Sequence, residues 1–340
     1  MRVVVAPDCF GGTLTAREAA EAIGRGWRSA APGDELLLRP LADGGPGFVD
    51  VLHGALGGVL HSSVVSGPRG EAVEARWLVA DDGTAYVESA QACGLHLVPV
   101  NERAASVESA TTRGVGELVA AADGLGCHTI VVGLGGSATT DGGAGLLSVV
   151  SSVSARVVAA SDVENPLLGP HGAAATFGPQ KGASAWVVAR LEDRLAAMDV
   201  LEPVRDLPGA GAAGGLGAAL LALGASVVSG AGLVRSLTRL DPALDGADLA
   251  VTGEGSFDWQ SLRGKLITAV AGGAAERGIP CVVLAGQVSV GRREAGAAGV
   301  QESYSVTEHA GSVEKSMADP AGTLTALAAD VARQWSHSRP

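Results

Sequence analysis

Hydrophobic residues form short runs that alternate with amphipathic segments toward both ends of the chain. The strand-like runs share the length and β-branched content of buried parallel strands, and they occupy residues 2–6, 35–39, 248–252 and 279–285. Residues 16–30 and 321–335 instead repeat their apolar positions at the spacing of a helix. Because strands alternate with helices at both ends, we predict that the two termini together build one α/β domain.

The middle of the chain has a different texture. Short β-rich runs separated by the turn sequences GPRG and DDG predict antiparallel structure, and they occupy residues 59–65, 72–79 and 85–88. We therefore place a domain change near residue 70 and expect an inserted α/β domain over residues 71–235. Residues 1–70 and 236–340 then form a discontinuous domain around a parallel sheet.

The most distinctive stretch is TIVVGLGGSATTDGGAG, at residues 129–145. An apolar run leads into a glycine turn, hydroxyl residues follow, and two further glycines open a helical pattern. Glycines let backbone N–H groups converge on one point, and a helix start adds partial positive charge, so this order is typical of an anion site. The alternative is a tight strand-to-helix connection whose glycines serve close packing alone. The candidate ligands are Gly135, Gly136, Ser137 and Thr139, with Asp141 placed where a hydrated Mg²⁺ could find a carboxylate.

Two aspartates each follow a predicted strand and precede a predicted helix. Asp8 comes just after the run at 2–6, and Asp43 lies in ADGGPG after the run at 35–39. In an open parallel sheet, such positions line the crevice at the carboxyl ends of the strands, where ligands bind. Each aspartate could equally serve as a helix cap, so both interpretations stay open.

Two further glycine-rich stretches carry different signals. GAGAAGGLG, at residues 209–217, contains a formal G-x-G-x-x-G, but no strand directly precedes it. We therefore interpret it as a helix start with close backbone packing and not as a dinucleotide site. GEGSFDWQSLRGK, at residues 253–265, follows a predicted strand and brings Glu254 and Lys265 to one loop–helix junction. It is not a Walker A motif, because Leu266 follows the lysine and the glycine spacing differs.

Composition and charge limit the classes of partner. Lys and Arg number 24 against 36 Asp and Glu, so the formal net charge of −12 argues against nucleic acid and anionic membranes as partners. Lysine is scarce, yet Lys181 and Lys265 both lie in glycine-bearing motifs, which favours a functional role over a solvated surface position. The four cysteines show no metal spacing, the first apolar run is too short for a signal peptide, and no apolar segment could span a bilayer. We therefore expect a cytoplasmic protein with reduced thiols.

With these motifs assembled, the chain resembles the bacterial glycerate kinase family from Met1 to about Gln287. The matching stretches occur in the family's order and are APDCFGGTLTAREAAEAI, ADGGPG, ESAQACGL, TTRGVGEL, GLGGSATTDGGAG, DVENPLLG, FGPQKGA, PGAGAAGGLGAAL and TGEGSFDWQSLRGK. The resemblance implies an ATP- and Mg²⁺-dependent kinase of D-glycerate, with 2-phosphoglycerate favoured over 3-phosphoglycerate as the product. It also implies two α/β domains, one Rossmann-like and discontinuous, with the active site in the cleft between them.

The sequence departs from the family pattern at four places. Gly11 stands where the first loop of the family has a lysine, and Pro46 stands where a glutamate is usual. Ser161 replaces the cysteine that precedes the aspartate of DVENP, and the chain between Ser148 and Arg156 is shorter by several dozen residues. The lost lysine could weaken anion binding, mark a different acceptor or mark a paralogue without catalysis.

We assign hypothetical roles by the needs of phosphoryl transfer, which are positioning and charge neutralisation. The 133–143 loop would bind nucleotide phosphates through its N–H groups and hydroxyls. A carboxylate must accept the proton of the attacking hydroxyl, and Asp162 is the first choice because it ends a strand in the family's most characteristic motif. The remaining assignments are Asp141 and Glu254 as Mg²⁺ ligands, Lys181 and Lys265 as cations for the transferring oxygens or the carboxylate, and Asp8 and Asp43 as groups that orient the substrate hydroxyls.

Two other functions stay open at this point. One is a kinase of another small hydroxy acid, since the groups that separate similar acids act through pocket geometry. The other is a non-catalytic ligand-binding homologue of the family. The sequence also leaves the oligomeric state open, with a homodimer as the candidate.

Overall fold

The computed structural model describes residues 1–259, 261–262 and 266–336 of the chain. The chain divides into two compact units, one formed by residues 1–42 with the residues from 234 onward, and the other by Asp43–Leu233. The first boundary therefore falls before Asp43 and not near residue 70. The physical reason is that strand β3 (Val59–Ser66) pairs along its whole length with β4 (Ala72–Val79), so a cut near residue 70 would divide a hairpin.

The first unit is built on a five-stranded sheet whose paired strands all run parallel, in the order β13-β11-β9-β1-β2. Its strands are β1 (Arg2–Val5), β2 (Glu35–Leu38), β9 (Leu249–Thr252), β11 (Cys281–Ala285) and β13 (Glu302–Ser305). Every residue of β9 and β11 is buried, which explains why their sequences are continuous apolar runs and do not alternate. This sheet confirms the parallel α/β architecture predicted for the two chain ends.

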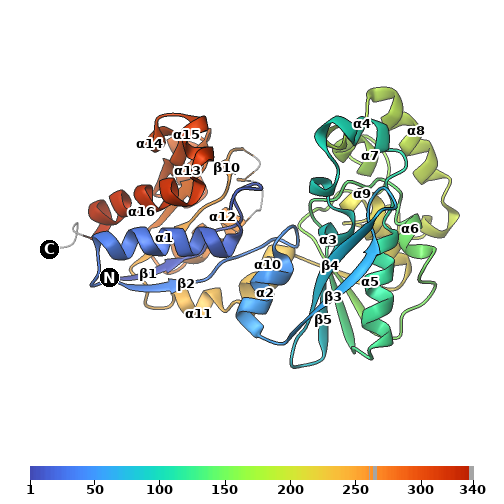
Figure 1. The fold of residues 1–340 in the computed structure, drawn as a ribbon, viewed down its shortest axis with the longest axis horizontal. Helices are drawn as coiled ribbons and strands as arrows, with labels where there is room; N and C mark the ends of the chain where they lie inside the picture. The colour runs from blue at the N-terminus through green and yellow to red at the C-terminus, as the bar shows by residue number, and fades with distance from the viewer. Residues whose placement is uncertain (260, 263–265, 337–340) are drawn as a thin grey trace. The chain divides into compact units, whose positions relative to one another are not determined.

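Helices α1 (Ala16–Ala30) and α16 (Pro320–Ser336) lie side by side in this unit (Figure 1). Thr15 and Glu18 form a capping box at the start of α1, and its T-x-x-E pattern can be read directly from the sequence. A side chain on Gly26 would begin 2.1 Å from the carbonyl oxygen of Thr325, so glycine is required for the two helices to approach. The remaining elements are α11 (Leu240–Leu244), α12 (Leu266–Ala275), α13 (Arg292–Ala297), α14 (Val306–Ala310), α15 (Val313–Ala318) and the short paired strands β10 (Ser256–Phe257) and β12 (Gln287–Val288).

The second unit is built on a six-stranded sheet in the order β3-β4-β5-β6-β7-β8. Its strands β3, β4 and β5 pair antiparallel, whereas β5 to β8 pair parallel. The latter strands are β5 (Thr84–Glu88), β6 (Thr129–Gly133), β7 (Arg156–Ala160) and β8 (Ser226–Val228). Its helices are α2 (Phe48–Leu56), α3 (Ser89–Cys93), α4 (Arg103–Ser106), α5 (Arg113–Gly124), α6 (Ala144–Leu147), α7 (Ala173–Phe177), α8 (Ala185–Ala196) and α9 (Ala212–Ala222), and α10 (Gly230–Leu237) crosses its C-terminal boundary.

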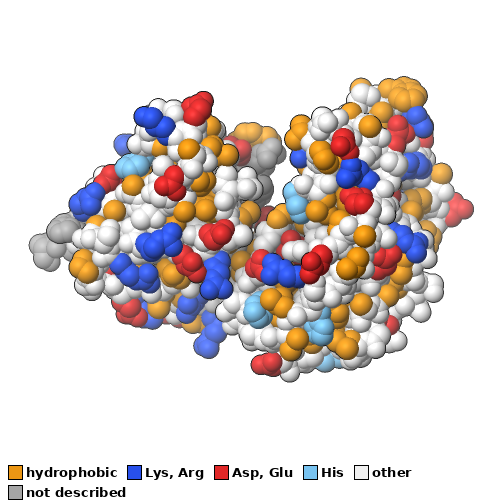
Figure 2. All heavy atoms as spheres, in the orientation of Figure 1, with side chains coloured by type: hydrophobic (Ala, Val, Ile, Leu, Met, Phe, Trp, Pro, Cys, Tyr) orange, Lys and Arg blue, Asp and Glu red, His pale blue; other side chains and the backbone are white. Residues whose placement is uncertain are grey.

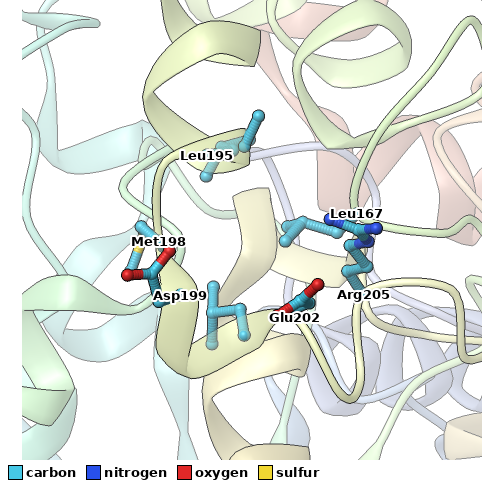
Figure 3. Close-up of a pocket in the computed structure, with 8 residues that line it drawn as sticks. Leu167, Leu195, Met198, Asp199, Glu202 and Arg205 are labelled. Atoms are coloured by element: carbon cyan, nitrogen blue, oxygen red, sulfur yellow. The ribbon is translucent and has the colours of Figure 1, made fainter.

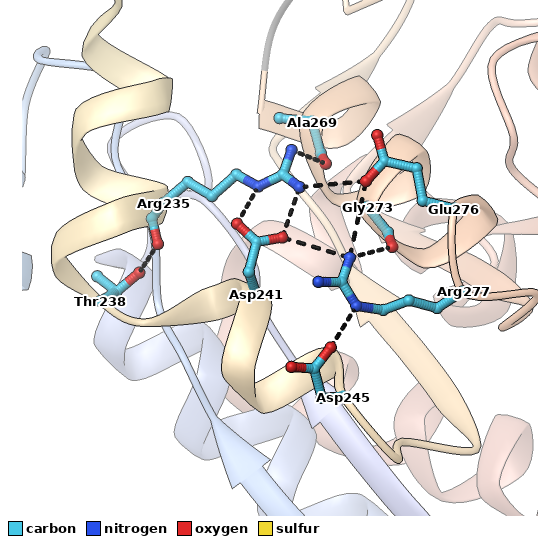
Figure 4. Close-up of polar contacts among 8 residues, drawn as sticks. All are labelled: Arg235, Thr238, Asp241, Asp245, Ala269, Gly273, Glu276 and Arg277. Atoms are coloured by element: carbon cyan, nitrogen blue, oxygen red, sulfur yellow. Dashed lines mark hydrogen bonds and ion pairs between the residues drawn. The ribbon is translucent and has the colours of Figure 1, made fainter.

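A network of ion pairs ties α10 to α11 and α12 within the first unit (Figure 4). Arg235 binds Asp241 through two hydrogen bonds of 2.9 and 2.6 Å. Arg277 bonds Asp245 at 2.7 Å and the carbonyl oxygen of Gly273 at 2.9 Å, and it also pairs with Asp241. Two-pronged arginine–carboxylate bonds of this kind fix orientation, although solvent screening keeps the contribution of each exposed pair to about 1 kcal/mol or less.

The surface carries side chains of both charges. On the face seen in Figure 2, basic and acidic side chains are interspersed with neutral surface. Among the described residues, no helix is long and apolar enough to cross a bilayer.

Candidate functional site

The loop that follows β6, residues 133–143, lies directly on the backbone of a second glycine loop. A side chain on Gly133 would begin 2.5 Å from the carbonyl oxygen of Gly44, and one on Gly135 would begin 2.5 Å from the Cα atom of Gly45. No real side chain tolerates such distances, so these positions require glycine. The ADGGPG stretch and the central stretch therefore form one rigid structure.

The third glycine-rich stretch supports the same loop from another direction. A side chain on Gly214 would begin 1.9 Å from the carbonyl oxygen of Thr139, and the N–H of Gly142 donates to the carbonyl oxygen of Gly214 at 3.1 Å. Ala213, Gly214 and Gly215 all have positive φ at the start of α9. This geometry confirms the interpretation of GAGAAGGLG as a helix start with close backbone packing.

Gly135 and Gly136 present the free donors of the loop. Their backbone N–H groups donate to no described residue, and Gly136 is exposed to solvent. Successive unpaired N–H groups at the end of a parallel strand form a concavity suited to an anion. The hydroxyl of Ser137 follows them, whereas Thr139 is fully buried and its hydroxyl donates to the carbonyl oxygen of Ala213 at 3.4 Å. The hydroxyl of Thr139 therefore joins the loop to the start of α9 and does not face solvent.

Lys181 reaches the loop from inside the protein. Its side chain is buried, and its Nζ atom donates to Ser137 Oγ at 3.2 Å and to the carbonyl oxygen of Thr139 at 2.5 Å. Burial lowers the pKa of this amine to about 8. The scarcity of lysine drew attention to this residue in the sequence, but residue type alone gave no sign that the amine would be buried.

Asp141 holds the C-terminal part of the loop in place by accepting hydrogen bonds from Thr112 and from the loop itself. Its Oδ2 atom accepts hydrogen bonds from the N–H and hydroxyl of Thr112, both at 2.9 Å, and from the N–H of Gly145 at 3.1 Å. Its Oδ1 atom accepts from the N–H of Gly143 at 3.0 Å. Four donors from the protein therefore surround the carboxylate to which the sequence assigned Mg²⁺.

Two more predicted residues lie at the same edge of this sheet. Asp162 follows β7, and its carboxylate accepts from Ser229 Oγ at 2.6 Å and from the N–H of Ala231 at 2.9 Å. Partial burial raises the pKa of Asp162, and the charge of nearby Asp43 adds to this effect against the two hydrogen bonds. The backbone of Asp43 lies against Gly230, where a side chain would begin 2.0 Å from the Asp43 carbonyl oxygen. The second unit thus brings together Asp43, Asp162 and the 133–143 loop.

Glu88 lies at the same edge of the sheet, and the sequence analysis did not single it out. It ends β5 opposite Gly133 of β6, is 2% exposed, and accepts from the N–H groups of Gly47 at 3.1 Å and Val49 at 3.3 Å. Burial raises the pKa of Glu88 to about 7, against those two hydrogen bonds. The available signal was a carboxylate that ends the predicted buried strand at 85–88, in the same position relative to its strand as Asp162.

In the first unit, Asp8 and Glu254 follow the adjacent strands β1 and β9. The chain leaves β1 toward β2 on one side and leaves β9 toward β11 on the other, so these two loops flank the switch point of the sheet, where ligands bind in open α/β folds. The N–H of Asp8 donates to the carbonyl oxygen of Gly253 at 2.8 Å. A side chain on Gly255 would begin 3.1 Å from the nitrogen of Gly11, so the two loops are in contact. Lys265, also predicted for this junction, lies outside the described residues.

The described part of the chain contains no cluster of side chains that could hold a metal ion by itself. No three His, Cys, Asp or Glu residues there lie close enough together to hold an ion by themselves. Mg²⁺ in kinases usually takes only one or two carboxylates and completes its shell with phosphate oxygens and water. A Mg²⁺ ion bound with phosphate would therefore need only one or two carboxylates from the protein.

A cavity of about 240 Å³ is lined by residues that include Leu167, Leu195 and Met198 (Figure 3). Leu195 and Met198, from its wall, would be 2.9 and 2.5 Å from a side chain on Gly142. The polar residues at the cavity are Asp199, Glu202 and Arg205. The cavity wall therefore touches the turn that carries Asp141, while the glycine donors lie elsewhere on the loop.

Comparison with known proteins gives one consistent result. A sequence model of the glycerate kinase family matches residues 3–154 and 148–336. An uncharacterized protein of Mycobacterium tuberculosis is 48% identical over 356 aligned residues, covering 100% of this chain and 93% of the relative. The glycerate kinase of Bacillus subtilis is 38% identical, covering 98% of this chain and 97% of the relative, and the glycerate 2-kinase of Escherichia coli is 38% identical, covering 85% and 86%. A crystal structure assigned to glycerate kinase 2 of Salmonella typhimurium superposes with a TM-score of 0.78 at 34% identity, covering 99% of this chain and 98% of that one.

Proposed function

Because the chain belongs to the glycerate kinase family and is therefore a kinase, we propose that it phosphorylates D-glycerate with ATP and Mg²⁺. One observation carries the proposal: the unpaired amides of Gly135 and Gly136 share a sheet edge with the carboxylates of Asp43 and Asp162. Anion donors beside a carboxylate with a raised pKa are what transfer of a phosphoryl group to a hydroxyl requires.

The phosphate chain of ATP fits the glycine loop. Backbone N–H groups of Gly135 and Gly136 and the hydroxyl of Ser137 would donate to phosphate oxygens. The rigid backing of the loop by Gly44 and Gly45 supports this role, since preorganised donors stabilise developing charge without rearranging. Thr139 would contribute to the shape of the loop and not to a direct contact.

Asp162 is the proposed general base. The residue is exposed to solvent, and the hydrogen bonds from Ser229 and Ala231 fix the orientation of its carboxylate. It would accept the proton of the attacking hydroxyl as the oxygen bonds to phosphorus, and Asp43 would orient the acceptor. We favour the 2-hydroxyl as the nucleophile, in line with the Escherichia coli relative named glycerate 2-kinase.

Bound Mg²⁺ would supply positive charge to the phosphate oxygens. Asp141 fits poorly as its ligand, because four donors of the protein already surround that carboxylate. We propose Glu254 as the protein ligand, with Asp8 and Lys265 serving the acceptor or the transferring oxygens. The buried thiols of Cys93, Cys127 and Cys281 fit a reducing compartment, and we propose a cytoplasmic location.

The test is turnover by the purified protein. ADP release from Mg²⁺-ATP should depend on D-glycerate within a panel of small hydroxy acids. Coupling the product to enolase separates the isomers, because enolase accepts 2-phosphoglycerate and not 3-phosphoglycerate. ADP release with a different acid alone would overturn the proposed acceptor, and nucleotide binding without turnover of any acid would favour a non-catalytic homologue.

A further inference from the structure

We propose that Lys181 is a positioning residue: from behind the glycine loop, its ammonium group fixes the Ser137 hydroxyl so that this group donates its proton to the bound phosphate. The inference rests on the proposed function, since it takes the 133–143 loop to be the phosphate site. It differs from a direct role for Lys181, in which the amine itself would contact an oxygen of the nucleotide or acceptor.

The path of the chain around Lys181 fixes the amine in place. Lys181 ends a short 3₁₀ turn, Pro179–Lys181, and the next residue, Gly182, has a φ of +100°. A side chain on Gly182 would begin 2.7 Å from the backbone nitrogen of Ala104, so this turn lies against the start of α4. The lysine is 3% exposed, and its amine therefore has little freedom to swing toward solvent or a ligand.

The hydrogen-bonding chemistry of the amine decides what the serine can do. An ammonium group has three donors and no acceptor, so Ser137 Oγ must accept the bond from Nζ. The same amine occupies the carbonyl oxygen of Thr139 at 2.5 Å. No described residue accepts a hydrogen bond from the Ser137 hydroxyl, so its proton is available to a ligand of the loop. Polarisation by the charged donor strengthens that outward bond.

Charges around the amine keep this arrangement in place at neutral pH. Burial lowers the pKa of Lys181 to about 8, while the negative charge of Asp141 favours the charged form of the amine. The Cys93 thiol stays neutral in this range, because burial raises its pKa to about 12. Lys181 is therefore mostly protonated at pH 7 and loses its proton as the pH rises through about 8. The neutral amine can accept a hydrogen bond, and the serine proton can then turn inward.

A double-mutant cycle on nucleotide binding tests the proposal. Lys181→Met, Ser137→Ala and the double variant are compared with the wild type by calorimetric titration with Mg²⁺-ATP, with Lys315→Met on exposed α15 as the matched control. Each single variant should weaken binding about tenfold, and the double variant should be no weaker than the worse single one. Losses that multiply to about a hundredfold would show that Lys181 acts independently of Ser137, and unchanged binding by Lys181→Met would remove its role.

A second measurement needs only proteins that retain Lys181. Between pH 7 and 9, the affinity of the wild type for Mg²⁺-ATP should fall through about pH 8, while that of Ser137→Ala stays nearly constant. Thermal stability should not fall with it, because losing the buried charge relieves a desolvation penalty between the folded pKa and the higher unfolded one. Equal pH dependence in both proteins would overturn the proposal. The binding of Mg²⁺-ATP is measured without the acceptor. If the protein fails to turn over D-glycerate but binds Mg²⁺-ATP, the proposed substrate is wrong, and the double-mutant cycle still tests the role of Lys181.

Discussion

Gly135 and Gly45 lie so close that a side chain on the first would begin 2.5 Å from the Cα atom of the second. The two residues are far apart in sequence, and each belongs to a loop that carries proposed ligands of the substrates. Their contact fixes the phosphate donors relative to Asp43. The geometry of the proposed site is therefore set by backbone and only secondarily by side chains.

Gly135→Ala should destabilise the protein by about 2 kcal/mol or more, because the added methyl group would overlap with backbone that has no room to retreat. Urea unfolding measures this loss. Gly124→Ala, on α5 of the same unit, is the matched control, since a side chain there meets nothing within 4 Å. The control should be neutral or stabilising by up to about 1 kcal/mol, as expected for alanine in a helix. Equal stability of the two variants would contradict the packing account.

Asp162→Asn should lower kcat by about 10²–10⁴-fold and leave the KM for Mg²⁺-ATP nearly unchanged, because it removes a base and keeps the shape. The base works only when ionised, so activity should fall as the pH drops through the raised pKa of Asp162. This acidic limb should lie above the range of an ordinary carboxylate. Steady-state kinetics from pH 4 to pH 8 check both points, with Asp193→Asn on exposed α8 as the control. Undiminished turnover by Asp162→Asn would remove it from the mechanism.

Glu88→Gln should change the pH dependence of stability. The pKa of Glu88 in the folded protein, about 7, lies above the ordinary glutamate value of 4.5, so the folded state holds this proton more tightly. The wild type should therefore lose stability relative to the variant as the pH rises from about 4.5 to 7, by at most about 3 kcal/mol. Unfolding free energies of both proteins at pH 5 and pH 7.5 give the comparison. A difference that stays constant with pH would show that Glu88 titrates normally.

Gly11→Lys restores the residue expected from the family resemblance. The position has open space but a φ of +44°, so the substitution should reduce stability by about 1–2 kcal/mol through left-handed backbone strain. If this loop faces an anionic substrate, KM for that substrate should fall about tenfold, as expected for one charge-assisted bond. Gly11→Ala carries the same strain without the charge and serves as the control. Equal KM values for the two variants would place the lysine away from the anion.

Periodicity predicted the elements well and their long-range partners poorly. The runs at 2–6 and 248–252 became β1 and β9 because a strand buried on both faces needs a continuous apolar sequence. The capping box of α1 was equally visible, since it depends on residues three apart. The boundary before Asp43 was missed although the runs at 59–65 and 72–79 were recognised as antiparallel. The hairpin belongs to the second unit because β5 continues its sheet and pairs with β6 far along the chain, and a local pattern does not report that contact.

Within the site, the chemical type of each residue was readable but its burial was not. Lys181 and Asp141 stood out as a scarce cation and a loop carboxylate, yet both are buried among protein partners. The sequence does not tell whether the amine of a lysine is solvated or buried, because the surrounding fold decides its exposure. Glu88 was missed for a different reason. A carboxylate at the end of a strand gives little signal in the sequence by itself, and its burial becomes visible only when the N–H groups of Gly47 and Val49 are found to donate to it.

The close contacts among the glycine loops restrict how this protein can diverge. Gly133 faces Gly44, Gly135 faces Gly45 and Gly214 faces Thr139, in every case through backbone atoms. A second substitution to a smaller residue cannot relieve the overlap caused by a side chain at one of these glycines. The contacting residue is itself a glycine or makes the contact through its backbone. Paired substitutions therefore cannot restore the packing at these positions. Selection for folded protein from a library randomised at these glycines should recover glycine almost exclusively. Change in substrate preference must then arise at positions around the loops, such as Gly11 and Pro46, where side chains reach open space or solvent.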